Sequence, residues 1–128
     1  MDYLLDTCTL LWLTRNPDRL SDLARQRLSS PAAKYWVSDV SCLELEIKIN
    51  AGKLALEKPL RLWFEEQAAL WKWNALAISR THLYQLETLD KHHLDPFDRL
   101  LVTQALVERM PILTPDPWIA RYPIQVIW

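Results

Sequence analysis

The sequence predicts an α/β fold built on a mainly parallel sheet. Short apolar runs that suit buried strands alternate with longer segments of helical periodicity from one end of the chain to the other. No internal repeat, linker or low-complexity tract interrupts this pattern, and 128 residues are enough to bury one core. We therefore expect residues 1–128 to form a single domain.

The first half of the chain is predicted to hold two strands and three helices. Residues 3–5 are an apolar run typical of a buried strand, with Asp6 at its carboxyl end. A helix through residues 10–13 ends at Asn16-Pro17-Asp18, and Ser21 caps a second helix over residues 20–28. Residues 35–37 form the next strand, closed by Ser38. The third helix runs from Asp39 or Ser41 to Ala51, with Gly52 at its C-terminal cap and an apolar stripe of Val40, Leu43, Ile47 and Ala51.

The second half continues the alternation. Residues 60–73 form a helix with an aromatic stripe, which favours core or oligomer packing over base stacking with RNA. A strand at 76–78 and a helix at 80–89 with Leu83, Leu86 and Leu89 inward come next. Asp95 then caps a helix that starts at Pro96 and runs to about Arg109. Strands at 111–113 and 124–128, separated by a helical turn at 118–121, complete the chain.

Composition excludes several classes of protein. Half the residues are hydrophobic and seven are tryptophan, so the chain is globular and not disordered. The first fifteen residues lack a basic segment, and no apolar run suits a membrane span, so we expect a cytosolic protein. Cys8 and Cys42 match no zinc or redox spacing. The single glycine rules out a P-loop and a dinucleotide-binding turn, and there is no nucleophile elbow for a catalytic serine.

Four carboxylates are expected to share one edge of the sheet. Asp6 ends the first strand and Asp116 follows the strand at 111–113, and ligands of open parallel sheets bind at such carboxyl ends. Glu44 and Asp98 can reach the same edge from the helices that carry them. Converging carboxylates need a cation to stay ionised, and hard oxygen ligands favour Mg²⁺ or Mn²⁺. Such a cluster suits phosphodiester hydrolysis.

The net charge of −1 gives no overall basic field for nucleic acid. If Asp95 and the four carboxylates line the site, however, eleven acids remain against fifteen bases, and the rest of the surface carries +4. That balance permits a polyanionic substrate without requiring one.

Each candidate also has a simpler interpretation. Asp98 lies in a first helical turn, where an acid complements the helix dipole, and Glu44 is spaced for an ion pair with Lys48. The adjacent His92 and His93 suit a solvated loop better than a metal site. Acidic neighbours are expected to raise the pKa of Cys8, which argues against a reactive thiol.

The ordered motifs nevertheless resemble those of one family. They are Leu4-Leu5-Asp6-Thr7 with Leu10-Leu11-Trp12, Val37-Ser38, Glu44 with Ile47-Lys48, Gly52-Lys53-Leu54, His93-Leu94-Asp95-Pro96-Phe97-Asp98-Arg99 with Gln104-Ala105, Leu113-Thr114-Pro115-Asp116, and Val126-Ile127-Trp128. Together they resemble PIN domains, specifically the VapC-like toxin ribonucleases of bacterial toxin–antitoxin pairs. The family often has His or Asn at the position of Cys8, Arg at that of Leu94 and Ala at that of Thr103, and the missing Arg puts substrate preference in doubt.

This resemblance implies an α/β/α sandwich with about five strands, a size ordinary for such sheets. It implies an Mg²⁺- or Mn²⁺-dependent endoribonuclease that is commonly a homodimer and is inhibited by an antitoxin, for which residues 60–73 would offer an apolar surface. Asp6, Glu44, Asp98 and Asp116 match the acidic site, with Asp6 and Asp98 on the principal cation. Supporting or substrate-binding positions are Thr7, Ser38, Asp95, Arg99 and Thr114.

Three other functions stay open from the sequence. A phosphatase of the haloacid-dehalogenase type would use Asp6 as nucleophile, but it would want a second acid where Cys8 stands. The fold could also serve as a binding module without activity, or as a DNA-directed nuclease.

Overall fold

The computed structural model describes residues 1–92 and 95–128, so His93 and Leu94 lie outside the described residues. Its centre is a five-stranded sheet in the order β3-β2-β1-β4-β5, and every pairing in it is parallel. The strands are β1 (Asp2–Leu5), β2 (Lys34–Ser38), β3 (Asn74–Leu76), β4 (Ile112–Leu113) and β5 (Val126–Ile127). The predicted α/β class with a parallel sheet is therefore confirmed.

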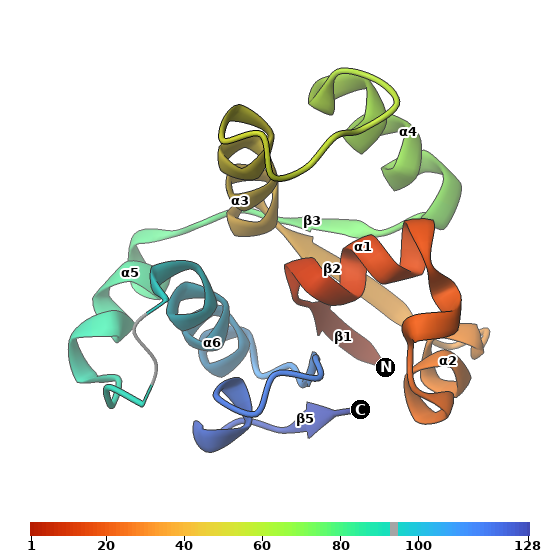
Figure 1. Cartoon of the computed structure of the whole chain (residues 1–128). Helices are drawn as coiled ribbons and strands as arrows, with labels where there is room; N and C mark the ends of the chain where they lie inside the picture. The colour runs from red at the N-terminus through yellow and green to blue at the C-terminus, as the bar shows by residue number, and fades with distance from the viewer. Residues whose placement is uncertain (93–94) are drawn as a thin grey trace.

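Helices cover both faces of this sheet (Figure 1). They are α1 (Thr7–Arg15), α2 (Asp22–Ser29), α3 (Asp39–Asn50), α4 (Leu60–Trp71), α5 (Arg80–Gln85) and α6 (Pro96–Glu108), with short 3₁₀ turns η1 (Pro17–Arg19), η2 (Leu86–Thr88) and η3 (Ile119–Arg121). In the described residues, no helix has the length and apolar character needed to cross a membrane.

The two faces of the sheet bury two separate clusters of apolar side chains. Tyr3 and Leu5 of β1 join the cluster that includes residues of α1, α2 and α4. Leu4, between them in sequence, joins the cluster that includes α6 and η3. This alternation follows from the two-residue period of a strand, which points successive side chains to opposite faces of the sheet.

The order of the strands creates a switch point beside β1. After β1 the chain adds β2 and β3 on one side, and it then crosses to add β4 and β5 on the other side. In open parallel sheets, ligands bind outside the carboxyl ends of the strands where the order reverses. That position lies between the residues that follow β1 and those that follow β4.

Several local predictions are confirmed. Ser21 caps α2 through its hydroxyl, and the Asp95 carboxylate caps α6 with Pro96 in the first turn. Gly52 has a φ of 72°, and its N–H donates to the Ile49 carbonyl while the Lys53 N–H donates to that of Lys48. These two bonds form a Schellman motif, so Gly52 ends α3 as expected.

The aromatic stripe of α4 packs against the protein's own core. Trp63 is buried, and Leu60, Phe64 and Trp71 pack against the same cluster. Two of the side chains that α4 leaves exposed are aliphatic, Leu62 and Leu70. The aromatic stripe is therefore a core face, and Leu62 and Leu70 are the large apolar side chains of α4 that remain open to a partner.

The predicted apolar stripe of α3 is wrong. Leu43 and Ile47 are 49% and 44% exposed, and Ala51 is exposed as well, whereas Val40, Ser41 and Leu45 are buried. The reason is that α3 packs against both layers: Leu45 joins one apolar cluster and Val40 the other. A helix buried on two sides has no single stripe that periodicity can locate.

Smaller corrections have local causes. The third strand lies at Asn74–Leu76, two residues before its predicted position, because β2 ends at Ser38 and offers no partner beyond Leu76. Helix α4 ends at Trp71, because Lys72 adopts a left-handed conformation. In α5, Leu83 is exposed and His82 is buried in its place. Leu23 on α2 is also exposed, although Leu20, Ala24 and Leu28 are buried as predicted.

Candidate active site

Asp6 occupies the switch point between β1 and β4. Its side chain is only 4% exposed, and it caps α1 by accepting the Thr9 backbone N–H at Oδ1, 2.8 Å away. The other oxygen, Oδ2, accepts a hydrogen bond from Thr114 Oγ1 at 2.5 Å. The strand end and helix start thus fix the carboxylate in one orientation, with both oxygens engaged.

Burial raises the pKa of Asp6 above its ordinary value of 3.8, because the charged form is deprived of water. Hydrogen bonds from Thr114 and Thr9 oppose this effect, and the negative charge of Asp116 adds to it. The second acid is therefore close enough for its charge to act on Asp6. A cation beside the two carboxylates would relieve both the desolvation and the repulsion.

Asp116 is connected to Asp6 through a single hydroxyl group. Thr114 Oγ1, which donates to Asp6, also accepts the backbone N–H of Asp116 at 3.0 Å. The Asp116 carboxylate in turn accepts the backbone N–H of Trp118 at 2.9 Å. Thr114 follows β4 directly, so the strand places its hydroxyl between the two acids.

Glu44 reaches the same region from α3. Its Oε1 accepts a hydrogen bond of 2.7 Å from Thr7 Oγ1, and Thr7 is the neighbour of Asp6 in the chain. Its Oε2 lies 3.2 Å from Lys48 Nζ, and the Glu44 side chain is 14% exposed. Both interpretations of Glu44 therefore hold: it forms the helical ion pair, and it also contacts the residue next to Asp6.

Asp95 and Asp98 lie at the start of α6, which packs against α3. Asp95 Oδ1 accepts the backbone N–H groups of Phe97 and Asp98 at 2.8 and 3.2 Å. Asp98 is half-buried, while Val102 one turn further on is fully buried, as the inward stripe of α6 predicts. Asp95 also lines a hollow together with Glu44, so the start of α6 faces the acid on α3.

The other predicted supporting residues make structural contacts. Arg99 donates to the backbone carbonyls of Asp90 and Leu89 and to the Tyr122 hydroxyl, which ties α6 to the preceding loop. Ser38 is fully buried, caps α3, and donates to Gln104 Oε1 at 2.5 Å. In these contacts both side chains hold helices in place.

No three His, Cys, Asp or Glu side chains within residues 1–92 and 95–128 are grouped closely enough to hold a metal ion. Asp6 and Asp116 nevertheless fit a hard divalent cation, because both supply carboxylate oxygens and the charge of Asp116 raises the pKa of Asp6. Glu44 and Asp98 do not complete a group of three in these side-chain positions.

Cys8 is an unsuitable nucleophile. Burial and the neighbouring Asp6 raise the pKa of its thiol to about 11, as the sequence predicted in direction. The thiolate that attacks or binds a soft metal is therefore scarce near neutral pH.

Comparison with known families assigns the chain to one group of proteins. The family model for the PIN domain matches residues 3–124. The chain belongs to the PIN domain family. A search of curated proteins gave no match.

Two solved structures resemble this PIN domain over nearly all of its length. One is VapBC2 from Rickettsia felis bound to a DNA fragment from its promoter, with 15% identity, a TM-score of 0.73, and 98% of this chain and 97% of that chain covered. The other is VapBC-1 from nontypeable Haemophilus influenzae, with 19% identity, a TM-score of 0.63, and 98% and 96% covered. At these identities the likeness establishes the fold.

Sequence reasoning missed a buried polar network in this PIN domain that connects α6 to α5 and to the end of β2. Gln104 is fully buried on α6, and its amide contacts Ser38 Oγ, the Ala77 carbonyl and His82 Nδ1. His82 is 1% exposed and also contacts Glu108. The available signal was a glutamine on the inward stripe of α6, between Leu101 and Ala105.

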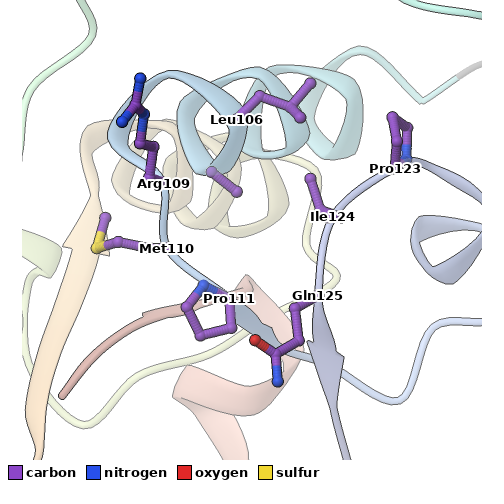
Figure 2. Close-up of a pocket in the computed structure, with 8 residues that line it drawn as sticks. Leu106, Arg109, Met110, Pro111, Pro123, Ile124 and Gln125 are labelled. Carbon is purple, nitrogen blue, oxygen red and sulfur yellow. The ribbon is translucent and has the colours of Figure 1, made fainter.

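A separate hollow of about 260 Å³ lies at the opposite edge of the sheet (Figure 2). Figure 2 shows Leu106 of α6 and Arg109, which follows that helix, on one wall, and Ile124 and Gln125 on the other. Pro111 and Gln125 precede β4 and β5, so this hollow faces the amino ends of the strands. It contains none of the four predicted acids.

Proposed function

We propose that this PIN domain is an endoribonuclease that depends on Mg²⁺ or Mn²⁺ and acts as the toxin of a toxin–antitoxin pair. The observation that carries the proposal is the placement of Asp6. A buried carboxylate that senses the charge of Asp116, at the switch point of a parallel sheet, is the environment that a hard cation would stabilise.

Asp6 and Asp98 would hold the principal cation, with Glu44 and Asp116 completing its coordination or that of a second ion. Glu44 and Asp98 would move toward Asp6 to do so. When bound, a divalent cation supplies a more acidic water and stabilises negative charge on the phosphate. No histidine or lysine is then required as a general base.

Hydroxyl groups of the protein would hold the carboxylates in position for this reaction. Thr114 fixes Asp6 and the backbone of Asp116 through one hydroxyl, and Thr7, the neighbour of Asp6 in the chain, donates to Glu44. A water molecule would attack the phosphorus, and the products would carry 5′-phosphate and 3′-hydroxyl ends. Preorganised positions of this kind reduce the reorganisation that the reaction requires.

An antitoxin partner, a homodimer and a cytosolic location are part of the same proposal. They rest on the resemblance to VapC-like toxins, and both similar structures are of VapBC proteins. An antitoxin that covers the acidic edge would block access of RNA to Asp6 and Asp116. Co-expression with the product of an adjacent reading frame that encodes a DNA-binding fold would test the pairing.

The direct test is cleavage of single-stranded RNA by the wild type and by Asp6→Asn and Asp98→Asn variants, with and without Mg²⁺ or Mn²⁺. We expect cleavage by the wild type only with the metal, and loss of cleavage by both variants. Unchanged activity in both variants would refute the proposal. Preference for single-stranded DNA would indicate a DNA-directed nuclease, and lack of both cleavage and Mn²⁺ binding would indicate a binding module.

A further inference from the structure

A groove beside Glu44 carries two lysines that the proposed chemistry does not use. Its volume is about 220 Å³, and it lies where the second half of α3 and the turn after it face the start of α6. The residues that line it are Glu44, Ile47, Lys48, Ala51, Lys53, Asp95 and Phe97. The groove therefore begins at one of the four predicted acids and leads away from it.

The Schellman motif at the end of α3 places the two lysines on the same wall. The Lys53 N–H donates to the Lys48 carbonyl at 2.9 Å, which folds residue 53 back over the last turn of the helix. Gly52 makes this reversal possible through its φ of 72°, a left-handed conformation that side chains other than glycine's rarely adopt. Lys48 and Lys53, five positions apart in sequence, thus line the same groove.

The two acids that line the groove, Asp95 and Glu44, accept hydrogen bonds from groups other than the lysines. Asp95 Oδ1 is engaged by the backbone N–H groups of Phe97 and Asp98. Glu44 is shared between the Thr7 hydroxyl and Lys48, with the ammonium group 3.2 Å from Oε2. The Lys48 side chain is 40% exposed, so its ammonium group can also contact an anion that enters the groove.

We infer that Lys48 and Lys53 form a binding subsite for a backbone phosphate of single-stranded RNA, next to the phosphate that is cleaved. The inference rests on the proposed function, because it requires an RNA strand at the acidic edge. Lysine binds phosphate as a flexible point charge, which suits recognition of a backbone without regard to base. The half-buried ring of Phe97 on the same groove offers a surface for the adjacent sugar or base.

The test uses Asp6→Asn as a background, so that the RNA stays intact during binding. The probe is a fluorescein-labelled single-stranded RNA of mixed sequence, roughly 12 nucleotides long, within the length range of single-strand sites. Fluorescence anisotropy gives the binding constant at KCl concentrations from about 25 to 200 mM. The slope of log K against log salt is negative, and each lost phosphate contact should reduce its magnitude by about 0.7.

We expect the double variant Lys48→Gln, Lys53→Gln to reduce the magnitude of this slope by about 0.7 to 1.4, for one or two phosphates. Replacement of both lysines with arginine should keep the slope, which separates loss of charge from damage to the fold. Lys34→Gln is the matched control, because Lys34 is exposed and begins β2 at the amino edge of the sheet. It should leave the slope unchanged.

An unchanged slope in the glutamine double variant, or no binding of RNA in the Asp6→Asn background, would overturn the inference. These outcomes differ from failure of the proposed function, which would show as absence of metal-dependent RNA cleavage by the wild type or as continued cleavage by Asp6→Asn. In that case the inference falls with the function on which it rests. If Asp6→Asn does not cleave RNA, and if adding the lysine substitutions leaves the salt slope of Asp6→Asn unchanged, only the phosphate subsite is refuted.

Discussion

Replacement of Asp6 with asparagine is expected to stabilise the protein at neutral pH while it abolishes cleavage. Asparagine caps a helix as well as aspartate does, so the bond from the Thr9 N–H to Oδ1 should remain. The amide group would stand where Oδ2 now accepts from Thr114, and it can donate to the Thr114 oxygen instead. The geometry is thus kept and the buried charge is removed.

The expected gain in the free energy of unfolding is the balance of two opposing effects. Two hydrogen bonds to a charged group become neutral ones, which costs about 1 kcal/mol each. Relief of the desolvation of a buried carboxylate is worth several kcal/mol, and loss of repulsion by Asp116 adds to it. A net stabilisation of about 1–2 kcal/mol results, and for a domain of this size it raises Tm by roughly 3–8 °C.

The difference in stability between Asp6→Asn and the wild type should also depend on pH, which provides a second check. Because the pKa of Asp6 is raised in the folded state, the native protein binds the proton more readily than the unfolded chain. The contribution of Asp6 to the free energy of unfolding of the wild type is therefore fully present below the ordinary pKa of 3.8. It is lost as the pH rises through the raised pKa that Asp6 has in the folded protein. The advantage of asparagine should be largest at pH 7 and should shrink as the solution is acidified.

The assay is urea unfolding and thermal melting of both proteins in EDTA, at pH 7 and at lower pH. Asp22→Asn is a suitable control, because that side chain is 98% exposed in the first turn of α2, and its effect should stay within about 0.5 kcal/mol. An Asp6→Asn variant that is less stable than the wild type at pH 7, or a difference that does not vary with pH, would refute the reasoning.

Three further predictions follow from the same geometry. Saturating Mn²⁺ should stabilise the wild type, by about 2.7 kcal/mol at one hundred times its Kd, and should leave Asp6→Asn nearly unchanged in thermal melts. Gln104→Leu should lower the free energy of unfolding by about 2–4 kcal/mol in urea, because it leaves the buried Ser38 and His82 without their amide partner; no loss would show that the network is dispensable. Cys8 should react with iodoacetamide at pH 8 about one hundred times more slowly than a thiol of ordinary pKa, because its own is raised to about 11. Fast alkylation of the native protein, measured in a Cys42→Ser variant, would contradict the burial of that thiol.

The sequence was a good guide where local chemistry decides the structure. Asp95 caps the helix that follows it, and Gly52 stands where the end of α3 requires a positive φ, as the sequence predicted for both. In each case one residue type satisfies backbone groups that no neighbour can satisfy. Because strand ends and helix starts could be located, Asp6 and Asp116 could be assigned to one edge of the sheet.

Prediction failed where packing from two sides decides the structure. The periodicity of α3 suggested that Leu43 and Ile47 were buried, but the helix divides its contacts between two apolar clusters and leaves both exposed. The position of β3 depends on where β2 ends, which is a property of the pairing and not of the residues of β3. Gln104 and His82 could not be paired from sequence, because their contact depends on how α5 packs against α6.

Diffraction from crystals soaked in Mn²⁺, with anomalous scattering used to locate the ion, tests the proposed metal chemistry most directly. We predict a peak bound by Asp6 together with Asp98 or Asp116, with Glu44 rotated away from Lys48. A peak bound by His92 and not by these acids, or carboxylates that stay apart at saturating Mn²⁺, would contradict it.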